Sequence, residues 1–210
     1  MERRERKRAA RRLLEAFDLE AVERWASAEP NAWPILQSLL FDPEAPVRWR
    51  AVEAVGRVSA VRARGDVERV REMIRRTVWL MNDESGGLLW LGPQVLGAVL
   101  ANVPALCGEF LEVLASFLEE EPFRAGTRWA LWRVALANPA AVAATAAALV
   151  PSLSDPDPEV RGHAALALAA ASGAAAVPAL AHDPTPLRVF DPRGGSFREA
   201  TVADVASGAF

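Results

Sequence analysis

Four stretches of this chain align on one short helical pattern, and this internal repeat constrains the fold more than any single residue does. The stretches are 47–58, 88–99, 123–134 and 160–171. One anchor position recurs in them at intervals of 41, 35 and 37 residues, as Arg48, Leu89, Arg124 and Arg161. Self-similarity at a period of a few tens of residues predicts a stack of similar supersecondary units. Because stacks of this kind host many unrelated activities, the repeat predicts the fold and leaves the function open.

The pattern predicts an all-α chain in three parts. A helix over residues 3–28 should end at Glu29, because the residue before a proline disfavours the helical conformation. We expect an N-terminal helical cap over 1–31, four helix pairs over 32–182, and a C-terminal β-hairpin with a short helix over 183–210. The expected pairs are 32–41 with 46–60, 66–82 with 92–103, 106–119 with 124–137, and 140–153 with 158–172.

The end of the chain departs from the helical pattern. Residues 187–190 and 196–200 flank the turn-forming segment 191–195, which predicts a short β-hairpin. Thr201 and Asp204 have the spacing of a helix cap, so a final helical turn should follow. Because the terminal unit of a stack has one face without a neighbour, we expect the hairpin to cap the last unit.

Composition is that of a globular protein. The chain has 210 residues, of which 51% are hydrophobic and 24% charged. It contains no apolar run of about 18 to 20 residues and no apolar signal-type stretch after Met1, so no membrane contact and a cytoplasmic location are expected. Cys107 is the one cysteine and should be a buried thiol. Two histidines, His163 and His182, are too few and too far apart for a metal site, and no cofactor is expected.

Charge gives a weak indication about partners. The formal net charge of −3 makes nucleic acid an unlikely partner without excluding it. The cations are mostly arginines in two groups, near the N-terminus and over residues 57–76. The second group is interleaved with Asp66, Glu68 and Glu72, which favours a solvated helix face with Glu–Arg pairs over a patch for an anionic ligand.

A longer motif carries a resemblance to a known family. The spacing Asp-Pro-x-x-x-Val-Arg-x-x-Ala-x-x-Ala-Leu/Val runs from Asp42 to Val55 and from Asp155 to Leu168. It resembles the HEAT-like repeat of the PBS-lyase type in the armadillo/HEAT superfamily, over roughly residues 32–188. The resemblance implies a short right-handed α-α superhelix whose second helices line a concave groove. It also implies that the motif's aspartate and arginine staple the loop to the following helix, often across to the next unit.

One stripe of the second helices is the candidate binding surface. At about 100° per residue, positions such as Val47 and Ala51 face the paired helix, and the opposite stripe should face the groove. The candidates on or beside that stripe are Trp49, Glu53, Trp90, Gln94, Trp129 and Trp132. Exposed tryptophans would mark a partner site, whereas in the alternative the rings pack between neighbouring second helices. Trp129 and Trp132 cannot share one direction, so at least one should be structural.

The second unit departs most from the repeat. It keeps the acid, Asp83, but has Leu89 where the arginine belongs, and it adds Glu84, Ser85, Gly86 and Gly87 before Trp90. Paired carboxylates are costly if buried and available to a partner if exposed, and glycines let a ligand approach the backbone. Alternatively, Arg124 or another distant arginine pairs with Asp83 and the glycines form a turn. The segment 82–90 is also similar to one in a small bacterial group of such repeat proteins.

These features predict a non-catalytic scaffold that binds a protein or peptide in a groove lined by tryptophan and arginine. One alternative is a nucleic-acid-binding HEAT-like protein, such as a DNA-glycosylase-like repair enzyme, with Asp83, Trp90 and Arg124 in the groove. The net charge and the acidic run 119–121 oppose that alternative. A second alternative, a tetrapyrrole lyase-like accessory protein, is implied by the family resemblance alone. Metal-dependent hydroxylases of this fold need paired His-Glu motifs, which the sequence lacks.

Overall fold

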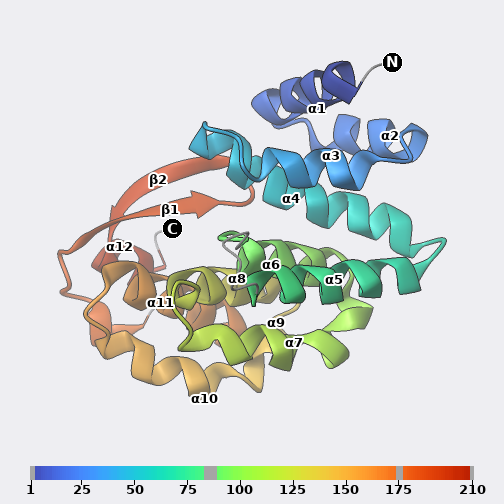
Figure 1. Cartoon of the computed structure of the whole chain (residues 1–210). Coiled ribbons are helices and arrows are strands. Elements are labelled where there is room, and N and C mark those ends of the chain that lie inside the picture. Colours follow the sequence, from blue (N-terminus) through green and yellow to red (C-terminus); the bar gives the residue numbers. More distant parts are fainter. Residues whose placement is uncertain (1–2, 83–88, 174–176, 209–210) are drawn as a thin grey trace.

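The computed structural model describes residues 3–82, 89–173 and 177–208. Within them the chain is all-α with a small two-stranded antiparallel sheet near its C-terminus, as the sequence predicts. The helices form two layers (Figure 1). The first layer contains α1 (Arg3–Ala16), α3 (Ala32–Leu39), α5 (Val67–Met81), α7 (Cys107–Ala115), α9 (Pro139–Ala143) and α10 (Ala146–Leu149). The second contains α2 (Leu19–Ala28), α4 (Ala45–Ala63), α6 (Gly92–Asn102), α8 (Arg124–Ala137) and α11 (Pro158–Ser172).

The second layer is the continuous part of the stack, because α2, α4, α6, α8 and α11 pack side by side in that order. Short 3-10 turns complete the first layer at η1 (Pro104–Leu106), η2 (Ser116–Leu118), η3 (Val150–Ser154) and η4 (Pro178–Leu180). The predicted helix pairs agree with these bounds to within a few residues, except that the first helix of the fourth pair is divided into α9, α10 and η3. No single described helix is long and apolar enough to cross a membrane, although the bent pair Gly92–Asn102 and Pro104–Leu118 meets both criteria together.

Glycines allow the second helices to approach one another closely. A Cβ atom placed on Gly97 of α6 would lie 2.7 Å from both the Cα and the Cβ of Ala130 in α8. A Cβ atom on Gly56 of α4 would lie 2.5 Å from the backbone oxygen of Ala98 in α6. Since these neighbours are largely backbone, neither contact can be relieved by turning a side chain. The small residue at each crossing therefore sets the spacing between helices, and one hydrophobic cluster runs through the stack from Ala10 to Ala206.

Alanine substitutions at two glycines should have opposite effects. Gly97→Ala should lower the free energy of unfolding by about 1 to 3 kcal/mol, because the added methyl overlaps α8. Gly108→Ala, on the exposed side of α7 where a Cβ meets no atom within 4 Å, should raise it by about 0.5 to 1 kcal/mol, because alanine favours a helix over glycine. Urea denaturation measures both values. A neutral or stabilising Gly97→Ala would show that the helices are spaced more widely.

The prediction of one helix over residues 3–28 is wrong. The chain breaks between α1 and α2 at Phe17, whose φ of 52° lies in the left-handed region. Asp18 then caps α2 by accepting a hydrogen bond of 2.8 Å from the backbone N–H of Ala21. The ring of Phe17 lies against Gly195 of the C-terminal hairpin and beneath the guanidinium of Arg50. These contacts come from distant parts of the chain, so local periodicity does not reveal the break.

The prediction of a C-terminal hairpin and a capped helix is confirmed. Strands β1 (Pro186–Asp191) and β2 (Ser196–Thr201) pair antiparallel, with Phe190 opposite Phe197. The turn between them uses Gly195 at a φ of 63°, which glycine adopts without strain. Thr201 and Asp204 form a reciprocal capping box at the start of α12 (Val202–Ala206). The elements predicted from local turn and capping residues therefore form as expected.

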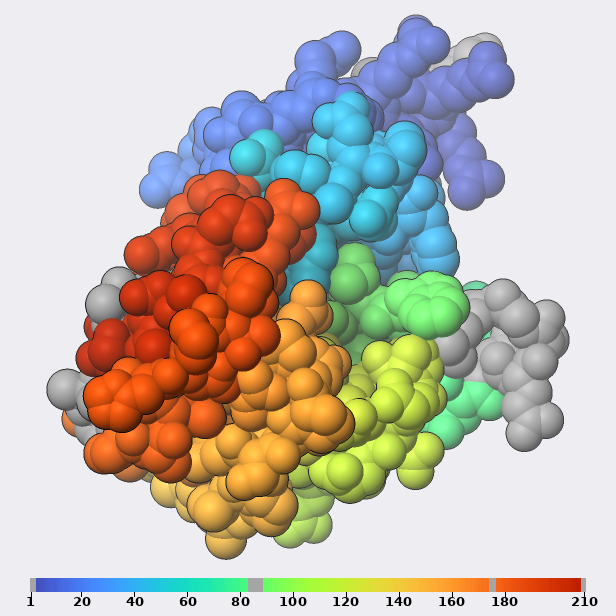
Figure 2. Space-filling model, turned by 90° about the vertical axis from the view of Figure 1, so that its left-hand side faces the viewer, coloured from blue at the N-terminus to red at the C-terminus, as the bar shows by residue number. Residues whose placement is uncertain are grey.

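The location of the hairpin differs from the expected cap on the last unit. Its base does pack on α11, where Leu187 lies against Gly162. From there it arcs toward the N-terminal units (Figure 1), and the start of α4 lies directly against the C-terminal segment (Figure 2). At its tip, Nε of Arg50 in α4 donates to the backbone oxygen of Gly195 at 2.7 Å. The hairpin is therefore a strap joining the last unit to the first ones.

Candidate functional site

The predicted groove stripe contains an aromatic cluster, which we define as Trp49, Trp129, Trp132, Phe190 and Phe197. The rings of Trp49 and Trp129 meet edge to face with centroids 4.9 Å apart, and Trp132 lies 6.2 Å from Trp129. Trp129 and Trp132 are both buried, so both are structural, and Trp49 is half-buried. The part of the stripe on α8 is thus packed inside the molecule.

The hairpin supplies the other half of this cluster. Phe190 and Phe197 lie 5.2 and 5.7 Å from the ring of Trp49. The indole Nε1–H of Trp129 donates to the backbone oxygen of Phe190 at 2.9 Å, which satisfies a buried polar group. Because β1 and β2 pack on this face, the groove prediction for these tryptophans is corrected: Trp49 and Trp129 contact the chain's own hairpin, and Trp132 is buried beside Trp129.

Glu53 belongs to the same stripe and is also buried. Arg133 of α8 clamps its carboxylate with Nε–Oε1 and Nη2–Oε2 distances of 2.9 and 3.0 Å. Burial raises the pKa of Glu53, and the nearby charge of Arg133 opposes that rise. The pair links α4 to α8 across α6. Removing one partner of such a pair typically costs about 3 to 5 kcal/mol, so the predicted ligand-binding role of Glu53 is replaced by a structural one.

The motif arginines hold the loops, but not through the carboxylate of their own loop. Nη1 of Arg161 donates to the backbone oxygens of Asp155 and Pro156 at 2.7 and 3.0 Å, and Arg48 binds its own loop in the same way. The aspartate carboxylates of these loops pair instead with arginines of other units. Asp155 pairs with Arg124 of the preceding unit, and Arg161 pairs at 2.8 Å with Asp183 of the next segment. The motif therefore links neighbouring units as well as each loop.

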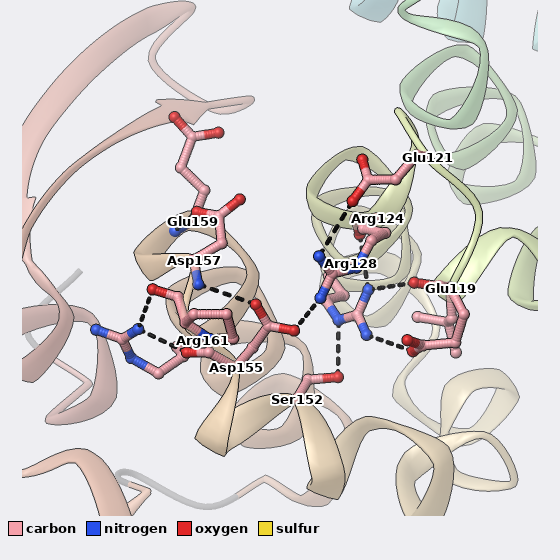
Figure 3. Close-up of polar contacts among 11 residues, drawn as sticks. Glu119, Glu121, Arg124, Arg128, Ser152, Asp155, Asp157, Glu159 and Arg161 are labelled. Carbon is pink, nitrogen blue, oxygen red and sulfur yellow. Dashed lines mark hydrogen bonds and ion pairs between the residues drawn. The ribbon is translucent and has the colours of Figure 1, made fainter.

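Arg124 is engaged in this network (Figure 3). Besides Asp155 it pairs with Glu121 at 3.1 Å. One turn later in α8, the buried guanidinium of Arg128 donates to Ser152 Oγ at 2.7 Å and to Glu119 Oε1 at 2.8 Å. Nη1 of Arg128 also donates to the backbone oxygens of Leu118 and Arg124, so each nitrogen of this buried charge has an acceptor. Arg124 thus makes two ion pairs, of which the one with Asp155 links neighbouring units, although its side chain stays partly exposed.

Two buried polar side chains lie on either side of α8. Gln94 packs against Gly126, and its Oε1 atom has no hydrogen-bond partner among the described residues. Nδ1 of His163 lies 3.1 Å from the backbone oxygen of Ala125. Burial lowers the pKa of His163 to about 4, so its imidazole is neutral at pH 7. Neither side chain reaches the surface, which places the candidate Gln94 inside the stack.

His163 should make stability depend on pH. In the unfolded chain its pKa is near 6.5, so that state binds the proton first as pH falls. The free energy of unfolding should therefore be highest above pH 6.5 and fall between pH 6.5 and 4, by about 3 kcal/mol from this residue. Comparing urea denaturation of the wild type and His163→Gln at pH 7 and pH 4 isolates the effect from carboxylate titration. Equal pH slopes in the two proteins would contradict this assignment.

Of the predicted binding residues that the structure describes, the exposed one is Trp90 in the second unit. Asp83, Glu84, Ser85, Gly86 and Gly87 lie outside the described residues. Trp90 follows them and is 65% exposed, and Trp79 at the end of α5 is also 65% exposed. The backbone N–H of Leu89 donates to the backbone oxygen of Leu80 at 3.4 Å. Trp79 precedes Leu80 and Trp90 follows Leu89, so this hydrogen bond brings the backbones of the two tryptophans together. We call this pair the tryptophan edge.

The sequence does not single out Trp79, because the charged run over residues 57–76 predicts a solvated helix face. Trp79 comes one residue before Leu80 of the Leu80–Leu89 hydrogen bond, and nothing in the repeat pattern marks that position as part of a site. Elsewhere, Phe41 between α3 and α4 and Val150 in η3 are exposed at 60% and 55%. No group of three or more His, Cys, Asp or Glu side chains in the described ranges could hold a metal ion.

Comparison with known proteins informs the fold and not the function. No protein family and no curated protein matches the chain. The fold is similar to a crystal structure of an engineered protein from the Northeast Structural Genomics Consortium, with a TM-score of 0.50 and 21% identity over 82% of this chain and 75% of that chain. A second engineered protein from the same consortium has a TM-score of 0.44 and 20% identity, over 86% of this chain and 50% of that chain.

Proposed function

We propose that the chain is a non-catalytic scaffold that binds a protein or peptide at the tryptophan edge. The observation that carries this proposal is the exposure of Trp79 and Trp90, each at 65%, on either side of the Leu80–Leu89 contact. Large aromatic side chains are normally buried, and adjacent exposed ones mark interaction surfaces. Tryptophan is also the residue most enriched at binding hot spots.

The arrangement of the other candidates supports the same surface. The hairpin strands pack on tryptophans of the aromatic cluster. Glu53 and Arg124 are in ion pairs, and Gln94 is buried in the stack. Among the binding residues predicted from the sequence, Trp90 is the one that the structure describes as exposed. The nucleic-acid alternative needs Arg124 free to hold a phosphate, but this arginine pairs with both Glu121 and Asp155. The protein-binding alternative needs none of these contacts to break.

The experiment is a quantitative pull-down from the native cytoplasm, followed by affinity measurement with the purified partner. Trp79→Ala/Trp90→Ala should weaken the dissociation constant at least about tenfold, because truncating a hot-spot tryptophan costs roughly 2 kcal/mol or more. Val150→Ala, which truncates an exposed apolar side chain in η3, should leave it unchanged.

Two results would contradict the proposal. One is recovery of the same partners at the same yield by the wild type and Trp79→Ala/Trp90→Ala. The other is tight binding of duplex DNA that weakens steeply with salt, which would favour the nucleic-acid class instead.

A further inference from the structure

A second open site lies between the first helices of units one and two. The cleft is bounded by α3, the C-terminal half of α4, and α5, and it has a volume of about 490 Å³. Its lining includes Trp33, Arg62, Arg69, Met73 and Arg76. We call it the arginine cleft. It is separate from the tryptophan edge, since neither Trp79 nor Trp90 lines it.

Helix α5 turns one stripe of side chains into this cleft. Arg69, Met73 and Arg76 are spaced as neighbours on one helix face, and Glu72 is the single carboxylate of the lining. Arg62 reaches the cleft from α4 and is fixed by donating to the backbone oxygens of Glu29 and Pro30 at 3.2 and 3.1 Å. Three guanidinium groups and one carboxylate therefore line the cleft, with Glu72 between Arg69 and Arg76 along α5.

On the opposite face of α5, the arginines have a carboxylate partner. Arg71 and Arg75 pair with Glu109 of α7, at 2.7 and 3.4 Å, across the interface between units two and three. No ion pair of the described residues includes Arg69 or Arg76. In the interface between α3 and α5, helix α3 contributes Trp33, Pro34 and Gln37 and no acid. The helix facing Arg69 and Arg76 thus supplies no carboxylate, whereas α7 supplies Glu109 to Arg71 and Arg75.

The walls of the cleft add an apolar surface beside these charges. Trp33, Pro34, Val70 and Met73 line it together with the arginines. A guanidinium pairs with a carboxylate through two parallel hydrogen bonds, and a tryptophan or methionine surface takes an apolar side chain. The combination matches a ligand that carries a carboxylate next to an apolar group.

We propose that the arginine cleft binds an acidic peptide segment, with a carboxylate side chain between Arg69 and Arg76 and an apolar side chain against Trp33 and Met73. The choice of a peptide rests on the proposed protein-binding function, and the site itself rests on the cleft. Nucleic acid fits less well, because the chain carries a net charge of −3 and the cleft offers an apolar wall instead of a continuous basic track.

The test is selection from a phage-displayed library of random dodecapeptides on the full chain, followed by affinity measurement of the best binder. We expect peptides enriched in Asp or Glu next to an apolar residue. Arg69→Gln/Arg76→Gln should weaken the dissociation constant by at least about tenfold, and raising the salt concentration should weaken binding to the wild type. The control Arg12→Gln/Arg75→Gln removes two exposed arginines outside the cleft and should stay within about twofold of the wild type.

Several results would overturn the proposal. They are selected peptides without acidic enrichment, equal loss in both arginine variants, or a single-stranded DNA oligonucleotide that binds more tightly than the peptide and depends on Arg69 and Arg76. If the selected peptide no longer binds Trp79→Ala/Trp90→Ala but still binds Arg69→Gln/Arg76→Gln, the tryptophan edge is its site and the arginine-cleft proposal is wrong. The converse pattern would support the cleft even where the edge binds nothing. Circular dichroism melting checks that each variant is folded.

Discussion

The contact between the C-terminal hairpin and the second helices is the interaction on which the rest of the structure depends. Trp129 donates its indole N–H to the backbone of Phe190, and Trp49 packs against the rings of both strands. In a simple repeat stack each unit contacts its neighbours alone. Here the strand pair that follows the last unit reaches α4 through Arg50, so the two ends of the stack stabilise each other.

This contact also determines which part of the predicted groove face is covered. Strands β1 and β2 cover the part of the predicted groove face that carries Trp49 and Trp129, whereas Trp90 stays exposed. The open surfaces are instead the tryptophan edge and the arginine cleft, both involving α5. Trp79 of the tryptophan edge and Arg69, Met73 and Arg76 of the arginine cleft all belong to α5.

Local signals in the sequence predict the elements, and distant contacts determine what the residues do. The helix pairs, the hairpin and the Thr201–Asp204 cap depend on periodicity and turn residues close in the chain, and they form as predicted. The break at Phe17 and the Glu53–Arg133 pair depend on residues far away in the sequence. The stripe containing Trp49 and Trp129 was correctly located on the helices, but nothing in the repeat indicates that the hairpin covers it.

The most direct test of this account is hydrogen exchange of the backbone amides in β1. A hairpin packed on the aromatic cluster should open with the stack as a whole, because amides in a cooperative unit share its opening free energy. The account predicts that protection in residues 187–190 matches that of α8 and falls sharply in Trp129→Ala. Fast exchange of these strand amides in the wild type, with α8 still protected, would mean that the groove is open and would contradict the account.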